Sequence, residues 1–178
     1  PELRLQAIAF GLERIDAVFY THSHADHIFG FDEIRRFNYL LGDQIPVYSD
    51  PATQSDLRRA FKYVFEATQE GGGKPRVDLR LMPDEMSLFG LHIRAVHVLH
   101  GELPVLAFRF NDFAYVTDVN RIPSDAMANL RGLDVLILNA VRYKPHATHF
   151  GLWEAVEVAR ELAPGRTYFT HISHKMEH

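Results

Sequence analysis

The chain has 178 residues, of which 47% are hydrophobic and 24% charged, values typical of one globular domain with a core of its own. It contains no apolar run near the ~20 residues of a membrane span, and it has no cysteine, which excludes disulfides and thiolate ligands. The net charge of −4, without a basic block, argues against an extensive nucleic-acid surface. We therefore expect a single domain over residues 1–178, cytoplasmic and not bound to a membrane.

The first third of the chain alternates helical and extended patterns. Hydrophobic spacing predicts a helix over residues 1–12, a short buried strand over residues 17–21 and a second helix over residues 32–41. Asp50 followed by Pro51 is a helix-start signal, with Asp50 as the cap, and predicts a third helix that reaches about residue 66.

A short strand is predicted just before that third helix, over residues 45–48. It contains Pro46, which cannot donate a backbone hydrogen bond and so favours an edge strand or the start of a strand. The glycine-rich residues 69–75 predict a flexible loop.

The rest of the chain is dominated by period-two and apolar runs, with two amphipathic helices. Strands are expected at residues 77–81, 86–89, 91–98, 105–110, 113–117, 134–138 and 167–170, and helices at residues 124–132 and 152–162. Residues 111–112 form the predicted tight turn of a hairpin. This mixture predicts an α/β protein, either a doubly wound sheet or a two-sheet sandwich with helices outside.

Residues 21–27 carry the strongest functional signal. Three histidines and one aspartate, His22, His24, Asp26 and His27, directly follow the first predicted strand. Ligands bind at the C-terminal edge of strands in α/β sheets, and imidazole with carboxylate suits zinc, manganese or iron. Protonated imidazoles this close would repel each other, whereas a bound metal ion holds them neutral. The pattern therefore predicts a metal site.

Three further residues of ligand type lie at the ends of predicted strands. His100 follows an apolar run, Asp118 ends another, and His171 ends the last predicted strand. A carboxylate at the end of an apolar strand is costly to desolvate unless it is paired or metal-bound. Taken singly, His100 is also compatible with an ordinary loop histidine and Asp118 with a helix cap, so their weight comes from occurring together.

The motif His-x-His-x-Asp-His formed by His22, His24, Asp26 and His27 resembles the signature of the metallo-β-lactamase superfamily. The resemblance implies an αβ/βα sandwich in which the usual N-terminal strands are missing. It also implies two divalent metal ions, zinc or manganese with iron as an alternative, which together hold a hydroxide nucleophile and clamp a phosphoryl group. The implied ligand sets are His22, His24 and His100 for one metal, Asp26, His27 and His171 for the other, and Asp118 as the bridge.

His149 discriminates between branches of that superfamily. It precedes the helix predicted over residues 152–162 and resembles the histidine that phosphodiesterase branches place ahead of the last ligand as a proton donor; a helix-start histidine is the alternative. Residues 169–174 are similar to the last motif of tRNase Z and of bacterial cyclic phosphodiesterases. We assign catalytic roles to His149 and to Asp26, which is also a ligand.

Substrate contacts are predicted in the same segment as His149. Arg142 and Lys144 suit phosphate oxygens, and His146 is a third candidate; an ordinary solvated loop is the alternative for the two cations. No organic cofactor is predicted.

The resemblance favours a metal-dependent phosphodiesterase whose partner is a small or cyclic phosphate ester. Alternatives are a thioester, lactone or lactam hydrolase of the same fold, a tRNA 3′-processing endonuclease, or an inactive metal-binding fragment. The short glycine run argues against the long arm of tRNase Z, and the absence of cysteine argues against dinuclear zinc β-lactamases, which commonly use a cysteine ligand.

An incomplete sheet exposes an edge, so we also expect aggregation or pairing into a homo-oligomer.

Overall fold

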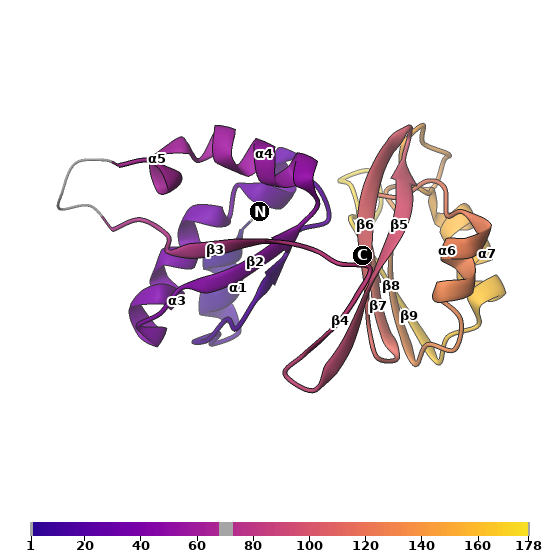
Figure 1. Cartoon of the computed structure of the whole chain (residues 1–178). Coiled ribbons are helices and arrows are strands. Elements are labelled where there is room, and N and C mark those ends of the chain that lie inside the picture. The colour runs from indigo at the N-terminus through magenta and orange to yellow at the C-terminus, as the bar shows by residue number, and fades with distance from the viewer. Residues whose placement is uncertain (1, 68–72, 178) are drawn as a thin grey trace. The chain divides into compact units, whose positions relative to one another are not determined.

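The computed structural model of the protein describes residues 2–67 and 73–177. Its contacts divide the chain into two compact units, Pro1–Met82 and Pro83–His178, called here the N-terminal and C-terminal units (Figure 1). Each contains its own sheet, so the protein is a mixed α/β protein with two sheets rather than one doubly wound sheet. In the parts of the chain that the structure describes, no helix combines the length and apolarity needed to cross a membrane.

The N-terminal unit is built on a parallel three-stranded sheet, in the order β1-β2-β3. Its elements are α1 (Leu3–Ala9), β1 (Val18–Phe19), α2 (Ala25–Ile28), the 3₁₀ helix η1 (Phe31–Glu33), α3 (Ile34–Leu41), β2 (Ile45–Ser49), α4 (Pro51–Ala60), α5 (Lys62–Phe65) and β3 (Val77–Leu81). The core lies where side chains of the helices meet the apolar residues of β2, with Phe31, Leu57 and Val47 all fully buried.

Two sequence predictions for this unit need correction. Pro46 lies in the central strand β2, not in an edge strand: β2 pairs with β3 from its first residue but with β1 only from Val47, so the missing N–H of Pro46 falls outside the β1 pairing. The third helix is not continuous, because Phe61, at φ −115° and ψ 43°, separates α4 from α5. Residues 69–72 of the glycine-rich stretch lie outside the described residues.

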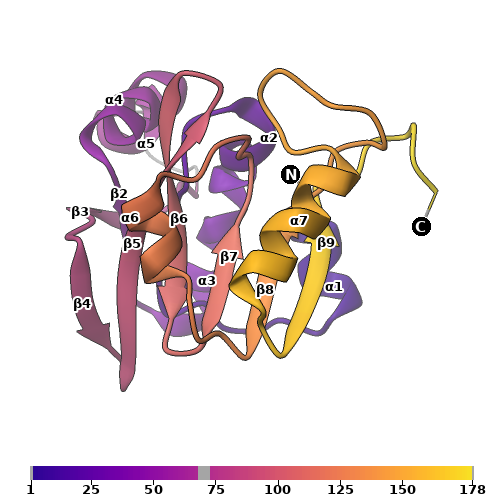
Figure 2. The ribbon, with the colours of Figure 1, turned by 90° about the vertical axis from the view of Figure 1, so that its right-hand side faces the viewer.

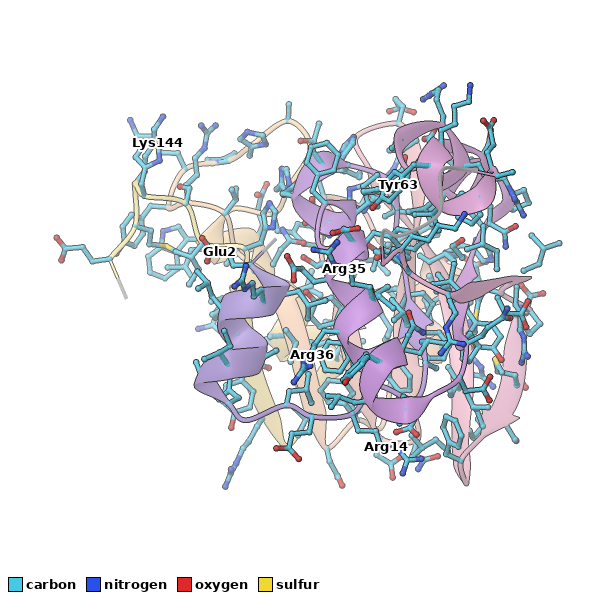
Figure 3. All side chains as sticks on the ribbon, turned by 90° about the vertical axis from the view of Figure 1, so that its left-hand side faces the viewer. Glu2, Arg14, Arg35, Arg36, Tyr63 and Lys144 are labelled. Atoms are coloured by element: carbon cyan, nitrogen blue, oxygen red, sulfur yellow. The ribbon has the colours of Figure 1, made fainter. Side chains whose placement is uncertain are left out.

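The predicted start of α4 is confirmed. The Asp50 carboxylate accepts a hydrogen bond from the backbone N–H of Thr53 at 2.6 Å, and Pro51 occupies the first turn. At the beginning of the chain, α1 is shorter than predicted and buries none of its residues. It lies beside α3 (Figure 3), and residues of both helices line an open cavity of about 650 Å³.

The C-terminal unit is a six-stranded sheet in the order β4-β5-β6-β7-β8-β9. Its elements are β4 (Glu85–Leu88), β5 (Leu91–His100), β6 (Leu103–Phe110), β7 (Phe113–Val116), α6 (Ser124–Asn129), β8 (Val135–Asn139), α7 (Leu152–Leu162) and β9 (Arg166–Thr170). Figure 2 shows α6 and α7 on one face of this sheet, where apolar residues of the helices and strands form the core. β5 and β6 are longer than predicted, and they form a hairpin about Gly101 that the sequence did not indicate.

The strand directions of this sheet bring distant residues to one edge. β4 to β7 are antiparallel in succession, while β7, β8 and β9 are parallel. Consequently β5, β7, β8 and β9 all run the same way, and their C-terminal ends share an edge. Strands that end about 70 residues apart in the sequence, β5 and β9, therefore end at the same edge of the sheet.

Candidate metal centre

The N-terminal histidine cluster is shaped by one turn and one short helix. Backbone pairing continues past β1, since the N–H of Tyr20 donates to the carbonyl of Tyr48 at 2.9 Å, and the chain then turns through Thr21. His24 is the N-cap residue of α2, and its carbonyl accepts from the N–H of His27 at 2.9 Å. The Ser23 hydroxyl donates to Asp56 of α4 at 2.5 Å, which ties this turn to the rest of the unit.

These local constraints place the side chains of the motif against one another. His22 Nε2 lies 2.9 Å from His24 Nδ1, and the ring centroids of His22 and His27 are 4.3 Å apart. His27 Nε2 is 3.4 Å from a carboxylate oxygen of Asp26. Only 3% of His22 is exposed, so a positive charge on it would be poorly solvated. Neutral imidazoles beside a carboxylate form a nitrogen-and-oxygen donor set that fits a divalent transition metal.

The C-terminal cluster gathers His100, Asp118 and His171 at the shared strand edge. His100 is the last residue of β5, Asp118 lies just after β7, and His171 directly follows β9. The end of β5 is also joined to the segment after Asp118, because Leu99 and Arg121 form an isolated antiparallel bridge. The topology of the sheet therefore brings these three residues together, whereas the residues of the N-terminal cluster are close because they are adjacent in the sequence.

Asp118 is the centre of this second cluster. It is 2% exposed; one carboxylate oxygen lies 3.1 Å from His171 Nδ1 and the other 3.4 Å from His149 Nε2. Asp118 and His171 both have left-handed backbone conformations, with φ of 56° and 57°. Non-glycine residues adopt this region at a cost, and such residues concentrate at functional sites.

The two protein ligands predicted beside Asp118 fit that assignment. In the C-terminal unit, ligand atoms of His100 and of His171 each lie within 4.8 Å of a carboxylate oxygen of Asp118. His100 Nδ1 is 2.7 Å from the carbonyl oxygen of Thr148. A carbonyl only accepts hydrogen bonds, so Nδ1 carries the proton and Nε2 keeps the lone pair that a metal needs. Thr148 is thus a positioning residue that sequence reasoning missed, since a backbone carbonyl leaves no signal in residue type.

His149 packs among the residues of this cluster. Its ring is stacked on that of His171, with centroids 4.9 Å apart, and lies 4.5 Å from that of His100. On its other side, His149 Nδ1 is 3.2 Å from His146 Nδ1 and 3.0 Å from the Thr148 hydroxyl. The predicted proton donor is therefore in direct contact with the carboxylate predicted to bridge the metals.

The segment that carries His146 and His149 is held by its neighbours. The Asn120 side chain accepts from the N–H of Gly101 at 2.7 Å and donates to the carbonyl of Ala147 at 2.8 Å. Arg142 donates to the carbonyls of Lys144 and Pro145, so its guanidinium braces its own loop as well as adding charge. A Cβ at Gly151 would lie 2.9 Å from the Lys144 carbonyl oxygen, so glycine permits the close passage of this loop.

Electrostatics in this segment favour neutral imidazole at His146. Burial is the first cause that lowers its pKa, and the positive charges of His149, Arg142, His100 and Lys175 lower it further.

His92 and His97 lie elsewhere, on strand surfaces beside Glu85 and Asp84. The assignment of individual metal ligands and catalytic residues stays a prediction.

Comparison with known proteins places the chain in a family. A family model for the beta-lactamase superfamily domain matches residues 2–172, and the chain belongs to this superfamily. This confirms the resemblance carried by residues 22–27 and identifies the two-sheet α/β architecture as the metallo-β-lactamase fold. The superfamily consists of metal-dependent hydrolases.

Two solved structures within the matches show which members of the superfamily the chain is similar to. A crystal structure of a new diphosphatase from the PhnP family is 40% identical, with a TM-score of 0.90, over 100% of this chain and 68% of that one. The short form of human tRNase Z is 17% identical, with a TM-score of 0.74, over 99% of this chain and 80% of that one, a likeness of fold alone.

A curated relative shows that similar sequences also occur within longer proteins. The chain is 27% identical to an octanoyltransferase of Porphyromonas gingivalis (strain ATCC BAA-308 / W83) over 176 residues, which are 98% of this chain. The chain spans only 35% of that protein's length, about a third.

Proposed function

We propose that this protein is a dinuclear metal-dependent phosphodiesterase that acts on a small or cyclic phosphate ester. The observation that carries the proposal is Asp118, a buried carboxylate whose two oxygens face His171 and His149. A carboxylate at 2% exposure needs cations or hydrogen-bond donors on both oxygens, and a pair of metal ions would supply that charge. The 40% identity to a PhnP-family diphosphatase supports hydrolysis at phosphorus.

The ligand sets are those implied by the superfamily resemblance. His22 and His24 with His100 would hold one ion, Asp26 and His27 with His171 the other, and Asp118 both. When bound, zinc, manganese or iron would supply an activated water and charge neutralisation for the phosphoryl oxygens. The absence of cysteine in the whole chain leaves a donor set of nitrogen and oxygen only.

The protein's own residues move the protons. A water oxygen forms a bond to phosphorus, and the bond from phosphorus to the leaving oxygen breaks. The Asp26 carboxylate, with 60% of its side chain exposed, is the group that accepts a proton from the water. His149, with 12% of its side chain exposed, gives a proton to the leaving oxygen, which would otherwise depart as a poorly stabilised alkoxide. Arg142, Lys144 and His146 contact the substrate.

Metal content and turnover measured on one sample test this function. We expect about two transition-metal ions per chain, hydrolysis of bis(p-nitrophenyl) phosphate, and much slower hydrolysis of a thioester, a lactone and a β-lactam. A preference for one of those esters would favour the acyl-hydrolase alternative, cleavage of a tRNA precursor would favour the endonuclease, and metal binding without any turnover would indicate a binding protein. The proposed homo-oligomer is tested separately by light scattering.

A further inference from the structure

Ser23 lies between two predicted metal ligands, but its side chain points away from them. His24 has an extended backbone, with φ −61° and ψ 150°. In an extended chain the side chains of residues i and i+2 lie on one side and that of residue i+1 on the other. His22 Nε2 and His24 Nδ1 accordingly approach to 2.9 Å, whereas the Ser23 hydroxyl donates to Asp56 Oδ2 of α4 at 2.5 Å. The middle residue of the His-x-His pair is thus bonded to a helix outside the motif.

The carboxylate that accepts this hydrogen bond is itself held in place. Its other oxygen, Asp56 Oδ1, accepts from Arg59 Nη2 at 2.7 Å, so separate donors occupy the two oxygens. The next residue, Leu57, is fully buried in the core of the N-terminal unit, and Thr53 on the preceding turn is buried as well. The helix therefore offers Ser23 an acceptor whose backbone is fixed by packing.

Loss of the bond between Ser23 and Asp56 should weaken metal binding. A hydroxyl bonded to a carboxylate is charge-assisted and roughly twice as strong as a bond between neutral groups. Groups outside a ligand set that orient its members typically contribute about 10–100-fold in metal affinity. Without this bond the turn that carries His22 and His24 would have to be ordered when the ion binds, and the lost conformational entropy would lower the affinity.

We propose that Asp56 is a positioning residue of the metal centre, which acts through Ser23 on His22 and His24. The proposal rests on the proposed function, which assigns those two histidines to one metal ion, and it adds a residue that belongs to neither predicted ligand set. Because Ser23 separates the two histidines, the ion assigned to them depends on Asp56 more than the ion assigned to Asp26 and His27.

A double-mutant cycle on zinc affinity tests this role. The metal-free full chain is titrated with Zn²⁺ in competition with a chromogenic chelator, and two binding steps are expected. Ser23→Ala and Asp56→Ala should each weaken one step by about 10-fold. The double variant should lose no more than either single variant, because both remove the same bond. Asp56→Asn keeps an acceptor for the hydroxyl and should recover most of the affinity.

Asp50→Ala is the matched control. It removes another carboxylate of α4, whose bonding partner is the N–H of Thr53 on the same helix. It should lower stability and leave both zinc-binding steps unchanged. Unchanged zinc affinity in Ser23→Ala would overturn the proposal, and that variant decides the matter if Asp56→Ala does not fold. Losses that simply add in the double variant would also overturn it, because Asp56 would then act on the ion by its charge and not through Ser23.

The zinc titration also separates this proposal from the proposed function. If the variants show the expected losses of zinc affinity but the zinc-loaded wild-type protein hydrolyses no phosphodiester, the proposed function fails and the role of Asp56 stands. If the wild-type protein hydrolyses a phosphodiester and Ser23→Ala binds zinc as tightly as the wild type, the role of Asp56 fails alone. A wild-type protein that binds no zinc would overturn the proposal together with the predicted metal centre.

Discussion

The two histidine clusters reach similar donor sets by different routes. The N-terminal cluster comes from six consecutive positions, and its geometry is set by one turn and the short helix α2. The C-terminal cluster combines His100, Asp118 and His171, which meet only because β5, β7 and β9 end at the same sheet edge. Their carboxylates also differ, since Asp118 is 2% exposed and Asp26 is mostly exposed. The geometry of the first cluster is therefore set mainly by local backbone structure, whereas that of the second depends on the strand order of the whole sheet.

The largest expected effect comes from Asp118. If it bridges two cations, Asp118→Ala should remove both metals or their spacing and lower kcat/KM on the order of 10⁴-fold, the scale of losing an essential group. Asp118→Asn should be nearly as damaging, because it keeps the shape and removes the charge. Metal analysis and turnover of bis(p-nitrophenyl) phosphate measure both.

The variant Asp26→Ala, in the N-terminal cluster, should differ from Asp118→Ala in the amount of metal that is lost. It should deplete mainly the metal ion that Asp26 is predicted to bind. The ligands predicted for the other ion are unchanged in this variant. Equal and mild effects of Asp118→Ala, Asp118→Asn and Asp26→Ala on metal content would contradict this division of roles.

The next effect concerns proton donation by His149. His149→Ala should lower the rate by about 10²–10⁴-fold for an alkyl or cyclic ribose phosphate, whose alkoxide needs a proton. It should lower the rate much less for a p-nitrophenyl ester, whose leaving group needs little help. Metal content should stay unchanged. Equal losses for the two substrates would make His149 a positioning residue, and loss of metal would make it a ligand.

Gly151 tests how far the C-terminal site depends on its surrounding loop. Gly151→Ala forces a Cβ within 2.9 Å of the Lys144 carbonyl oxygen, and relieving that overlap should cost about 1–3 kcal/mol of unfolding free energy. Thermal unfolding should show a Tm lower by several degrees, with reduced turnover because the same loop carries His149. Gly73→Ala is the matched control, since its Cβ would meet nothing within 4 Å. A Tm loss as large in Gly73→Ala would remove the steric explanation.

The smallest effect is expected from the cap of α4, in the N-terminal unit. Asp50→Ala removes the acceptor for the Thr53 N–H and should cost about 1 kcal/mol of stability, measured by urea unfolding. Asp50→Ser retains an acceptor and should recover most of it. Turnover at temperatures well below the Tm should change little, because Asp50 belongs to neither predicted ligand set; a large loss of activity in the folded variant would link this helix to the site.

The sequence by itself determined the elements whose signals are local. The helix predicted over residues 152–162 coincides with α7, and Asp50 caps α4 as its type and spacing predicted. The motif at residues 22–27 was recognisable because its ligands are adjacent. The strand ends at His100, Asp118 and His171 were also visible, since a polar residue after an apolar run marks the end of a buried strand.

Only the tertiary structure decided which distant elements meet. Pro46 sits in a central strand because its missing N–H falls outside the β1 pairing, a matter of register that residue type does not encode. The contacts of Asp118 with His149 and His171, and the Thr148 carbonyl that orients His100, depend on strand order and on a loop packed across Gly151. Periodicity reports which face of an element is buried. Which elements pair is settled by long-range packing, and that pairing places the C-terminal cluster of this hydrolase fold.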